Sequence, residues 1–180
     1  MKEIIVSGFG GQGVLSLGLF LSYSAMNMNF NTSWLPSYGP EMRGGTANVR
    51  VVYSGGEIAC PLVTNPDVLV AFNEPSLAKF ETSVKENGCI FVNSSIVKSK
   101  VKRTDVNVFY VPVDELASGI NPRGGNIIML GAMLTVLDSL TDEAAQAAVI
   151  QVFKSKPNLI EPNLRCLREG TAYVNGESNK

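Results

Sequence analysis

The sequence predicts a single α/β domain with a three-layer α/β/α, Rossmann-like architecture, a mostly parallel sheet and an antiparallel hairpin insert. A β-branched run at 3–7 is followed by a glycine-rich turn at 8–13 and an apolar helix, which is how doubly wound domains begin. The segment 66–72, whose last five residues are all apolar, is typical of a buried parallel strand. Between these segments, residues 47–60 alternate between apolar and polar around Gly55-Gly56, and this pattern predicts the hairpin.

The remaining elements follow from periodicity and end signals. A second strand is expected at 29–35, and further strands at 89–93 and 106–113. Helices are expected at 14–21, 76–85, 127–140 and 162–173, with another that begins at the N-cap residue Thr141. The domain should cover residues 1–174 and leave 175–180 as a polar tail.

Composition excludes several classes of function. With 15 basic and 16 acidic side chains in 180 residues and no basic stripe, the chain does not resemble a nucleic-acid-binding protein. It has no leader-like segment and no apolar run of about 18 residues, so we expect a cytoplasmic protein that does not enter the membrane. Histidine is absent, which removes the commonest general base and metal ligand. The cysteines, Cys60, Cys89 and Cys166, form no C-x-x-C pair, so no iron-sulfur cluster or structural zinc is expected in this chain.

The glycine turn is the first candidate site. Gly8, Gly10 and Gly13 have the spacing G-x-G-x-x-G, in which glycines allow a tight turn and close approach of a ligand to bare backbone. Backbone amides of Gly10, Gly11, Gln12 and Gly13 at a helix start favour an anion, and the Gln12 side chain adds a neutral donor.

This motif alone does not establish a dinucleotide site. Such a site also needs an acid at the end of the second strand, about twenty residues on, to bind the ribose. That strand ends in Pro36-Ser37-Tyr38-Gly39 without an acid, and Glu41 lies beyond a proline-glycine turn. Binding of NAD or FAD is therefore disfavoured. Two interpretations of the glycine turn stay open: it binds an anion without help from a ribose-binding acid, or its glycines only shape the corner between strand and helix.

The second candidate site is the loop within 34–46. Its prolines and glycines predict a defined shape, and it displays Tyr38, Glu41, Met42 and Arg43. We expect it at the carboxyl edge of the sheet beside the glycine turn. Arg43 would bind a carboxylate or phosphate there, or else pair internally with Glu41. Asn73 and Asn121, which lie in later loops, are expected to line the same crevice. The predicted binding residues are Gly8, Gly10, Gly11, Gln12, Gly13, Arg43, Asn73 and Asn121, with no catalytic residue and no metal ligand.

Four stretches give the chain a resemblance to a known family: 8–13, 37–48, 65–67 and 73–76. The most specific is the run Tyr38-Gly39-Pro40-Glu41-Met42-Arg43-Gly44-Gly45. Together they resemble the gamma subunit of 2-oxoacid:ferredoxin oxidoreductases, of the 2-oxoglutarate or 2-ketoisovalerate type. The resemblance covers residues 1–173 and implies a Rossmann-like domain that assists catalysis only within a multi-subunit enzyme.

In that family a 2-oxoacid is oxidatively decarboxylated, its acyl group passes to coenzyme A and the electrons go to ferredoxin. The resemblance implies that thiamine diphosphate, Mg²⁺ and iron-sulfur clusters lie in alpha, beta or delta partner subunits. This chain would contribute assembly and a contact with coenzyme A or a partner; a homodimer stays open. Two alternatives also stay open, namely a free-standing NAD(P)- or flavin-dependent reductase and a non-catalytic nucleotide-binding module. The sequence does not identify the 2-oxoacid.

Overall fold

The computed structural model describes residues 1–39 and 45–178, and over these residues it has one six-stranded sheet in the order β2-β3-β1-β4-β5-β6. Its strands are β1 (Lys2–Phe9), β2 (Asn31–Tyr38), β3 (Thr46–Ser54), β4 (Val68–Ala71), β5 (Cys89–Asn93) and β6 (Asn107–Val111). β1, β4, β5 and β6 are parallel neighbours, whereas β3 runs antiparallel between β1 and β2. The sheet is therefore mixed, and β3 alone runs against the other described strands.

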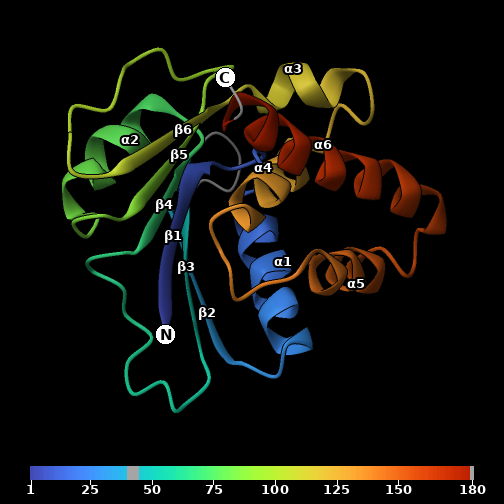
Figure 1. The fold of residues 1–180 in the computed structure, drawn as a ribbon, viewed down its shortest axis with the longest axis horizontal. Helices are drawn as coiled ribbons and strands as arrows, with labels where there is room; N and C mark the ends of the chain where they lie inside the picture. Colours follow the sequence, from blue (N-terminus) through green and yellow to red (C-terminus); the bar gives the residue numbers. More distant parts are fainter. Residues whose placement is uncertain (40–44, 179–180) are drawn as a thin grey trace.

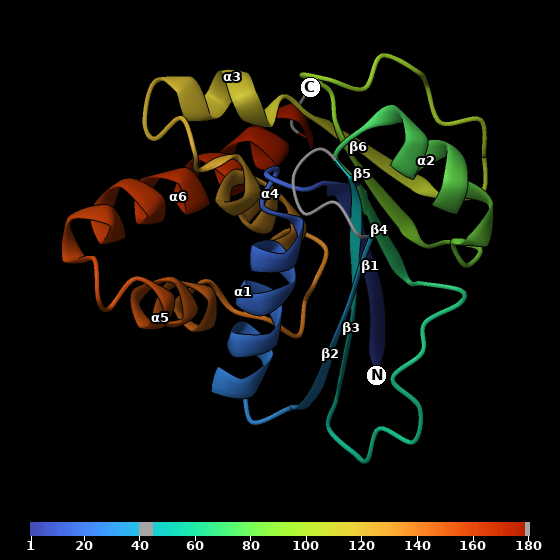
Figure 2. The ribbon, with the colours of Figure 1, turned by 180° about the vertical axis from the view of Figure 1, so that it is seen from behind.

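Helices cover both faces of this sheet, as the predicted three-layer fold requires (Figures 1 and 2). One face carries α1 (Val14–Asn27), α3 (Val113–Ser118), α4 (Gly125–Leu134), α5 (Asp142–Val152) and α6 (Ile160–Ser178). The other carries α2 (Glu74–Phe80), the 3₁₀ turn Glu81–Ser83 and the long connections that flank them. Because the strands are buried on both sides, β4 has no exposed position, which explains its continuous apolar run.

The predicted hairpin has a different partner from the one expected. Residues 57–60 form no strand, and β3 instead pairs with β2 in an antiparallel ladder from Asn31↔Ser54 to Tyr38↔Ala47. The prediction of a hairpin around Gly55-Gly56 is wrong because both edges of β3 are already paired, one with β2 and the other with β1. The antiparallel insert exists, but it consists of β2 and β3.

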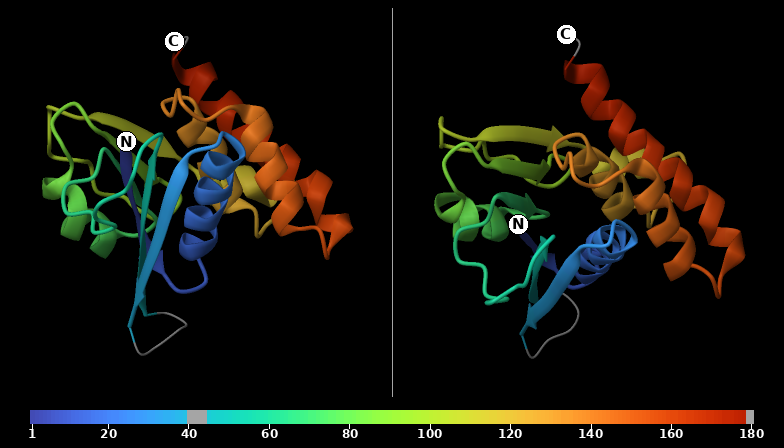
Figure 3. Two further views of the ribbon diagram at one scale, coloured as in Figure 1. Left: turned by 90° about the horizontal axis from the view of Figure 1, so that it is seen from below. Right: turned by 60° about the horizontal axis from the view of Figure 1, so that its bottom comes forward.

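β2 forms one edge of the sheet (Figure 3). It contains Pro36. The Gly39 amide donates to the Thr46 carbonyl at 3.2 Å, so this pair is hydrogen-bonded. Bonded and non-bonded pairs alternate along an antiparallel ladder, so the odd-numbered residues of β2 bond to β3 and the even-numbered ones direct their backbone groups outward. Pro36 therefore occupies an outward position, where its missing N–H removes no bond from the ladder.

Several element ends differ from the sequence prediction. Helix α4 stops at Leu134 instead of 140, because β-branched Thr135 and Val136 are followed by the turn formers Asp138 and Ser139. Helix α6 continues to Ser178, so the segment expected to be a polar tail is helical that far. Thr141 caps α5 as predicted, since its hydroxyl accepts the Ala144 amide at 3.2 Å.

Helices α4 and α6 cross with their backbones in direct contact at two glycines. A Cβ atom on Gly131 would lie 2.0 Å from the Leu167 carbonyl oxygen, and one on Gly170 would lie 1.9 Å from that of Ile128. The Thr171 hydroxyl also donates to the Gly131 carbonyl at 3.0 Å. Such a crossing admits no side chain at either glycine, which places the buried helix α4 tightly between α6 and the sheet.

An ionic cluster ties the amino end of the sheet together. The Lys85 ammonium lies 2.7 Å from the Glu3 carboxylate and 2.8 Å from that of Asp67. Asp67 also accepts the Glu3 amide at 2.7 Å. The cluster joins the chain ahead of β4 to β1 at the edge opposite the glycine turn.

Within the described ranges, no helix combines the length and apolar character that crossing a bilayer requires.

Candidate functional site

The glycine turn forms a rigid corner between β1 and α1. Gly11 and Gly13 adopt positive φ angles of 103° and 77°, and Gly13 is the N-cap residue of α1. A Cβ atom on Gly8 would lie 2.7 Å from the Gln12 Oε1 atom and 2.9 Å from the Phe72 Cβ atom. Gly8 therefore permits close packing behind the corner, and Gly11 and Gly13 permit its backbone path.

Two of the four amides expected to face a ligand are used inside the chain. The Gly10 amide donates to the Gly45 carbonyl at 2.9 Å, and the Gln12 amide donates to the Phe9 carbonyl at 3.2 Å. Within the described residues no acceptor is found for the amides of Gly11 and Gly13. These two, together with the first turn of α1, which has no side-chain cap and no acidic residue, are the donors that remain.

The Gln12 side chain joins the ends of β1 and β4. Its Oε1 atom accepts the Phe9 amide at 2.7 Å, and its Nε2 atom donates to the Phe72 carbonyl at 3.2 Å. Asn73 adds a third bond, from Nδ2 to Gln12 Oε1 at 3.3 Å. Gln12 therefore holds the corner in place. Its side-chain amide was predicted to donate to a ligand, but one of its two hydrogens is already bonded to the Phe72 carbonyl.

The loop that follows Tyr38 (residues 39–45, the Tyr38 loop) is described only at its ends, and its Gly45 end lies beside the glycine corner. Besides the bond between Gly10 and Gly45, Phe9 is in register with Thr46, at the carboxyl edge of the sheet. Tyr38 is 59% exposed at the end of β2. Arg43, with residues 40–44 as a whole, lies outside the described residues, so its predicted role stays a prediction.

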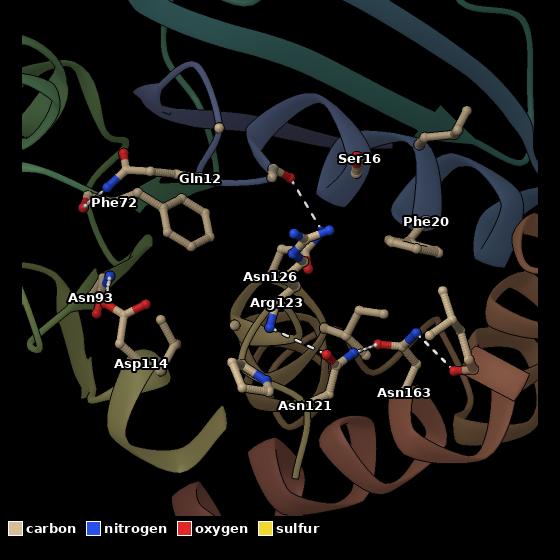
Figure 4. Close-up of a pocket in the computed structure, with 18 of the residues that line it drawn as sticks. Gln12, Ser16, Phe20, Phe72, Asn93, Asp114, Asn121, Arg123, Asn126 and Asn163 are labelled. Carbon is tan, nitrogen blue, oxygen red and sulfur yellow. Dashed lines mark hydrogen bonds between the residues drawn. The ribbon is translucent and has the colours of Figure 1, made fainter. Parts of the chain in front are cut away.

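A cavity of about 640 Å³ opens on the α1 side of the corner (Figure 4). Gly11, Gly13, Asn121 and Asn126 contribute to its polar wall, and Arg123 supplies the cationic side chain of its lining. The cavity also has an apolar part, where Phe20 and Phe153 stack with ring centroids 6.0 Å apart. It combines backbone donors, amide side chains and a guanidinium with an apolar wall.

The two predicted asparagines have different positions. Asn121 lines the cavity, donates to the Asn163 Oδ1 atom at 2.9 Å and accepts the Arg123 amide at 3.2 Å. Asn73 is buried, caps α2 by accepting the Ser76 amide at 2.9 Å, and reaches the corner only through Gln12. The structure thus brings Gly11, Gln12, Gly13 and Asn121 to one cavity, while Gly8, Gly10 and Asn73 support it from behind.

Sequence reasoning missed Arg123, Asn126 and Asn163 as lining residues. Asn126 approaches the corner from the start of α4, where its Nδ2 atom lies 3.4 Å from the Gly13 carbonyl oxygen. The glycine loop at 121–126 was a visible signal for the first two, because a glycine loop before an apolar helix resembles the first corner. Asn163 lies inside α6 and carries no such signal.

Carboxylates on the far wall of the cavity are held by local donors. Asp114 accepts Asn93 Nδ2 at 3.1 Å. The Ser95 hydroxyl donates to the neighbouring Glu115, and this bond lowers the pKa of that carboxyl below its ordinary value. These bonds tie the start of α3 to the end of β5.

A second hollow, of about 520 Å³, lies on the other side of the glycine corner. It is lined by the corner, the first turn of α1 and the β2 residues Trp34, Pro36 and Tyr38, and its described lining has no charged side chain. The corner therefore separates a mixed polar cavity from an apolar groove.

The cysteines are poorly placed to hold a cluster. Cys60 is exposed in the connection after β3, Cys89 begins β5, and Cys166 is buried in α6 against Gly124. Burial raises the pKa of the Cys89 and Cys166 thiols, which disfavours the thiolate that a metal needs. Across the described part of the chain, no three His, Cys, Asp or Glu side chains are grouped as metal ligands.

Over residues 3–173 the sequence matches the family described as pyruvate ferredoxin/flavodoxin oxidoreductase. The chain belongs to this family. The match spans almost the whole chain and confirms the resemblance stated from the glycine corner and the Tyr38 loop.

Two relatives and one solved structure are also similar to this chain. Ketoisovalerate oxidoreductase subunit VorA of Methanothermobacter marburgensis is 40% identical over 174 residues, 96% of this chain and 36% of that protein. 2-Oxoglutarate synthase subunit KorC of Methanocaldococcus jannaschii is 35% identical over 153 residues, 83% of this chain and 82% of that protein. The chain thus spans little more than a third of VorA and most of KorC.

The solved structure is the gamma subunit of a keto/oxoacid ferredoxin oxidoreductase from Geobacter sulfurreducens PCA. It superposes with a TM-score of 0.80 at 26% identity and covers 98% of this chain and 99% of its own. The predicted α/β fold class is confirmed by this likeness and by the sheet described above.

Proposed function

We propose that this chain acts as the gamma-type component of a 2-oxoacid:ferredoxin oxidoreductase in the cytoplasm. Such an enzyme oxidatively decarboxylates a 2-oxoacid, transfers the acyl group to coenzyme A and passes the electrons to ferredoxin. The family match over 3–173 carries the proposal. The names of the relatives point to 2-ketoisovalerate or 2-oxoglutarate as the acid.

The chemistry of this chain fits a supporting role within a complex. It has no histidine, and its cysteines lie on separate elements with two of the three thiol pKa values raised. These residues do not suit an iron-sulfur cluster. We assign thiamine diphosphate, Mg²⁺ and the clusters to alpha, beta or delta partner subunits, and we expect this chain to be inactive alone.

The contribution of this chain is proposed to come from the carboxyl edge of the sheet. The amides of Gly11 and Gly13, which have no acceptor among the described residues, favour a negatively charged group in the 640 Å³ cavity, as do the uncapped start of α1 and the Arg123 guanidinium. A coenzyme A phosphate has that charge. The Tyr38 loop, with Arg43, would contact the partner subunit that carries the thiamine cofactor.

Pull-down of the tagged chain from its native cells tests the main proposal. We expect larger thiamine-dependent subunits to co-purify, and the complex to reduce ferredoxin with a 2-oxoacid only when coenzyme A is present. A comparison of 2-ketoisovalerate with 2-oxoglutarate identifies the acid. Recovery of the chain alone, or of a complex without this activity, would contradict the proposal.

Two arginine variants test whether the carboxyl edge of the sheet contributes to coenzyme A binding or to assembly. Arg123→Ala should raise the KM for coenzyme A by about tenfold, the effect of losing one charge-assisted contact. Arg165→Ala is the matched control, because Arg165 is exposed on α6 outside the cavity lining. Arg43→Ala should weaken coenzyme A use or assembly. Normal assembly and kinetics in both Arg43→Ala and Arg123→Ala would remove the proposed role of this edge.

A further inference from the structure

The fold contains a crevice at the point where open α/β sheets often bind dinucleotides. Helix α1 follows β1 onto one face of the sheet, whereas α2 follows β4 onto the other. Adjacent parallel strands whose helices leave in opposite directions define a switch point, and ligands bind outside the carboxyl ends of such strands. The G-x-G-x-x-G corner lies at this position, so the fold by itself suggests an NAD- or FAD-type ligand.

The Gln12 side chain bridges the ends of β1 and β4 at this crevice. Its Oε1 atom accepts the Phe9 amide at the end of β1 and the Asn73 amide group, while its Nε2 atom donates to the Phe72 carbonyl after β4. In a dinucleotide site, backbone donors at the corner bind pyrophosphate oxygens. Here an internal amide oxygen already lies 2.7 Å from the amide nitrogen of Phe9, the last residue of β1 before the corner.

The ribose side of the crevice is also unsuitable. A dinucleotide domain places its ribose-binding acid at the end of a parallel strand beside β1. In this chain the neighbour on that side is the antiparallel β3, which begins there with Thr46 and Ala47. The residues present therefore do not fit a dinucleotide, for reasons independent of Gln12.

We propose that Gln12 is a specificity-determining residue that closes the dinucleotide crevice, with its amide oxygen in the acceptor position of a pyrophosphate oxygen. The corner is thereby fixed without a nucleotide, while the cavity on its α1 side and the apolar groove beside β2 stay open to other molecules. This proposal does not depend on the function of the complex.

The wild-type chain gives the first test. We expect calorimetric titration with NAD⁺ to show no binding, and the Phe9 amide to exchange slowly with solvent in NMR spectra. Binding of NAD⁺ that shifts the Phe9 and Asn73 resonances of the wild-type chain would overturn the proposal.

Substitutions give the second test. Gln12→Ala leaves the Phe9 amide without its acceptor and opens space, so we expect a melting temperature roughly 5 °C below wild type. Millimolar inorganic pyrophosphate should then raise it by about 3 °C, a response larger than that of wild type. The control is Gln151→Ala, because Gln151 is an exposed residue of α5. Equal melting temperatures and equal pyrophosphate responses in the two variants would refute the assignment.

A third variant covers the case in which Gln12→Ala does not fold. Gln12→Met keeps most of the side-chain volume but cannot accept or donate the same bonds. We expect exchange of the Phe9 amide to become about tenfold faster with no gain in pyrophosphate response, since the space stays filled. Unchanged protection of the Phe9 amide in Gln12→Met would show that Gln12 does not satisfy this donor, and the proposal would fall.

Discussion

The crossing of α4 and α6 leads to a quantitative prediction for Gly170→Ala. The added Cβ atom would lie 1.9 Å from the Ile128 carbonyl oxygen and 3.0 Å from the Ala132 amide nitrogen. A carbon atom normally approaches a carbonyl oxygen no closer than about 3.3 Å, so the helices must separate by roughly 1.4 Å. Because α4 is buried between α6 and the sheet, this movement disturbs the packing of the larger core.

Two opposing terms set the size of the effect. Alanine in a helix is favoured over glycine by about 1 kcal/mol. Overpacking a rigid site costs about 1–3 kcal/mol and occasionally more, and backbone contact on both sides puts this site at the upper end. We expect Gly170→Ala to destabilise the fold by about 2 kcal/mol, a melting temperature lower by roughly 4–8 °C.

Gly176→Ala is the matched control in the same helix, because an added Cβ atom there meets nothing within 4 Å. It should leave stability unchanged or raise it by up to about 1 kcal/mol. Urea unfolding followed by circular dichroism measures both free energies of unfolding. Equal values for the two variants would refute the reasoning, since they share helix propensity and differ only in the contact with α4.

Three further outcomes follow from local contacts. Asn73→Ala removes the α2 cap and should cost about 1–2 kcal/mol in urea unfolding; no loss would mean that the cap is dispensable. Burial opposes the charge of Lys85, but bonds to its two carboxylate partners outweigh it and raise the pKa of the ammonium above 10.5. A group whose pKa is higher in the folded chain than in the unfolded chain stabilises the fold at pH values below its unfolded pKa, and this contribution is lost as the pH rises through its folded pKa. Relative to Lys85→Met, the wild type should therefore lose stability above about pH 10.5. A thiol reagent should modify exposed Cys60 promptly and buried Cys166 only on unfolding, which mass spectrometry would detect; prompt modification of Cys166 would contradict its burial.

The location of the candidate site could be predicted because it depends on chain direction alone. The glycine corner ends β1, and the Tyr38 loop ends a strand that runs the same way, so both had to meet at one edge. The confirmed contact is the bond between Gly10 and Gly45. The pairing partner of β3 could not be predicted. The alternation of apolar and polar residues shows that a strand has one apolar and one polar face, but it does not show which strands lie beside it.

Side-chain partners across long sequence separations could not be predicted either. Gln12 was expected to donate to a ligand, yet its partner Phe72 is 60 residues away and is brought close only by the pairing of β1 with β4. Gly131 and Gly170 stand in helical segments where nothing in the local pattern distinguishes them from tolerated glycines. Their importance arises only from the crossing of two helices.

The proline in β2 bears on how the purified chain behaves at high concentration. Consider two copies of the chain that pair antiparallel through their β2 strands, with Trp34 of one copy opposite Trp34 of the other. Pro36 of each copy would then lie opposite Thr32 of the other, and each of these two residue pairs would lack one amide donor. Lateral growth of the sheet from molecule to molecule is thereby penalised at every junction. The edge strand β2 therefore carries its own obstacle to polymerisation of the chain through sheet extension.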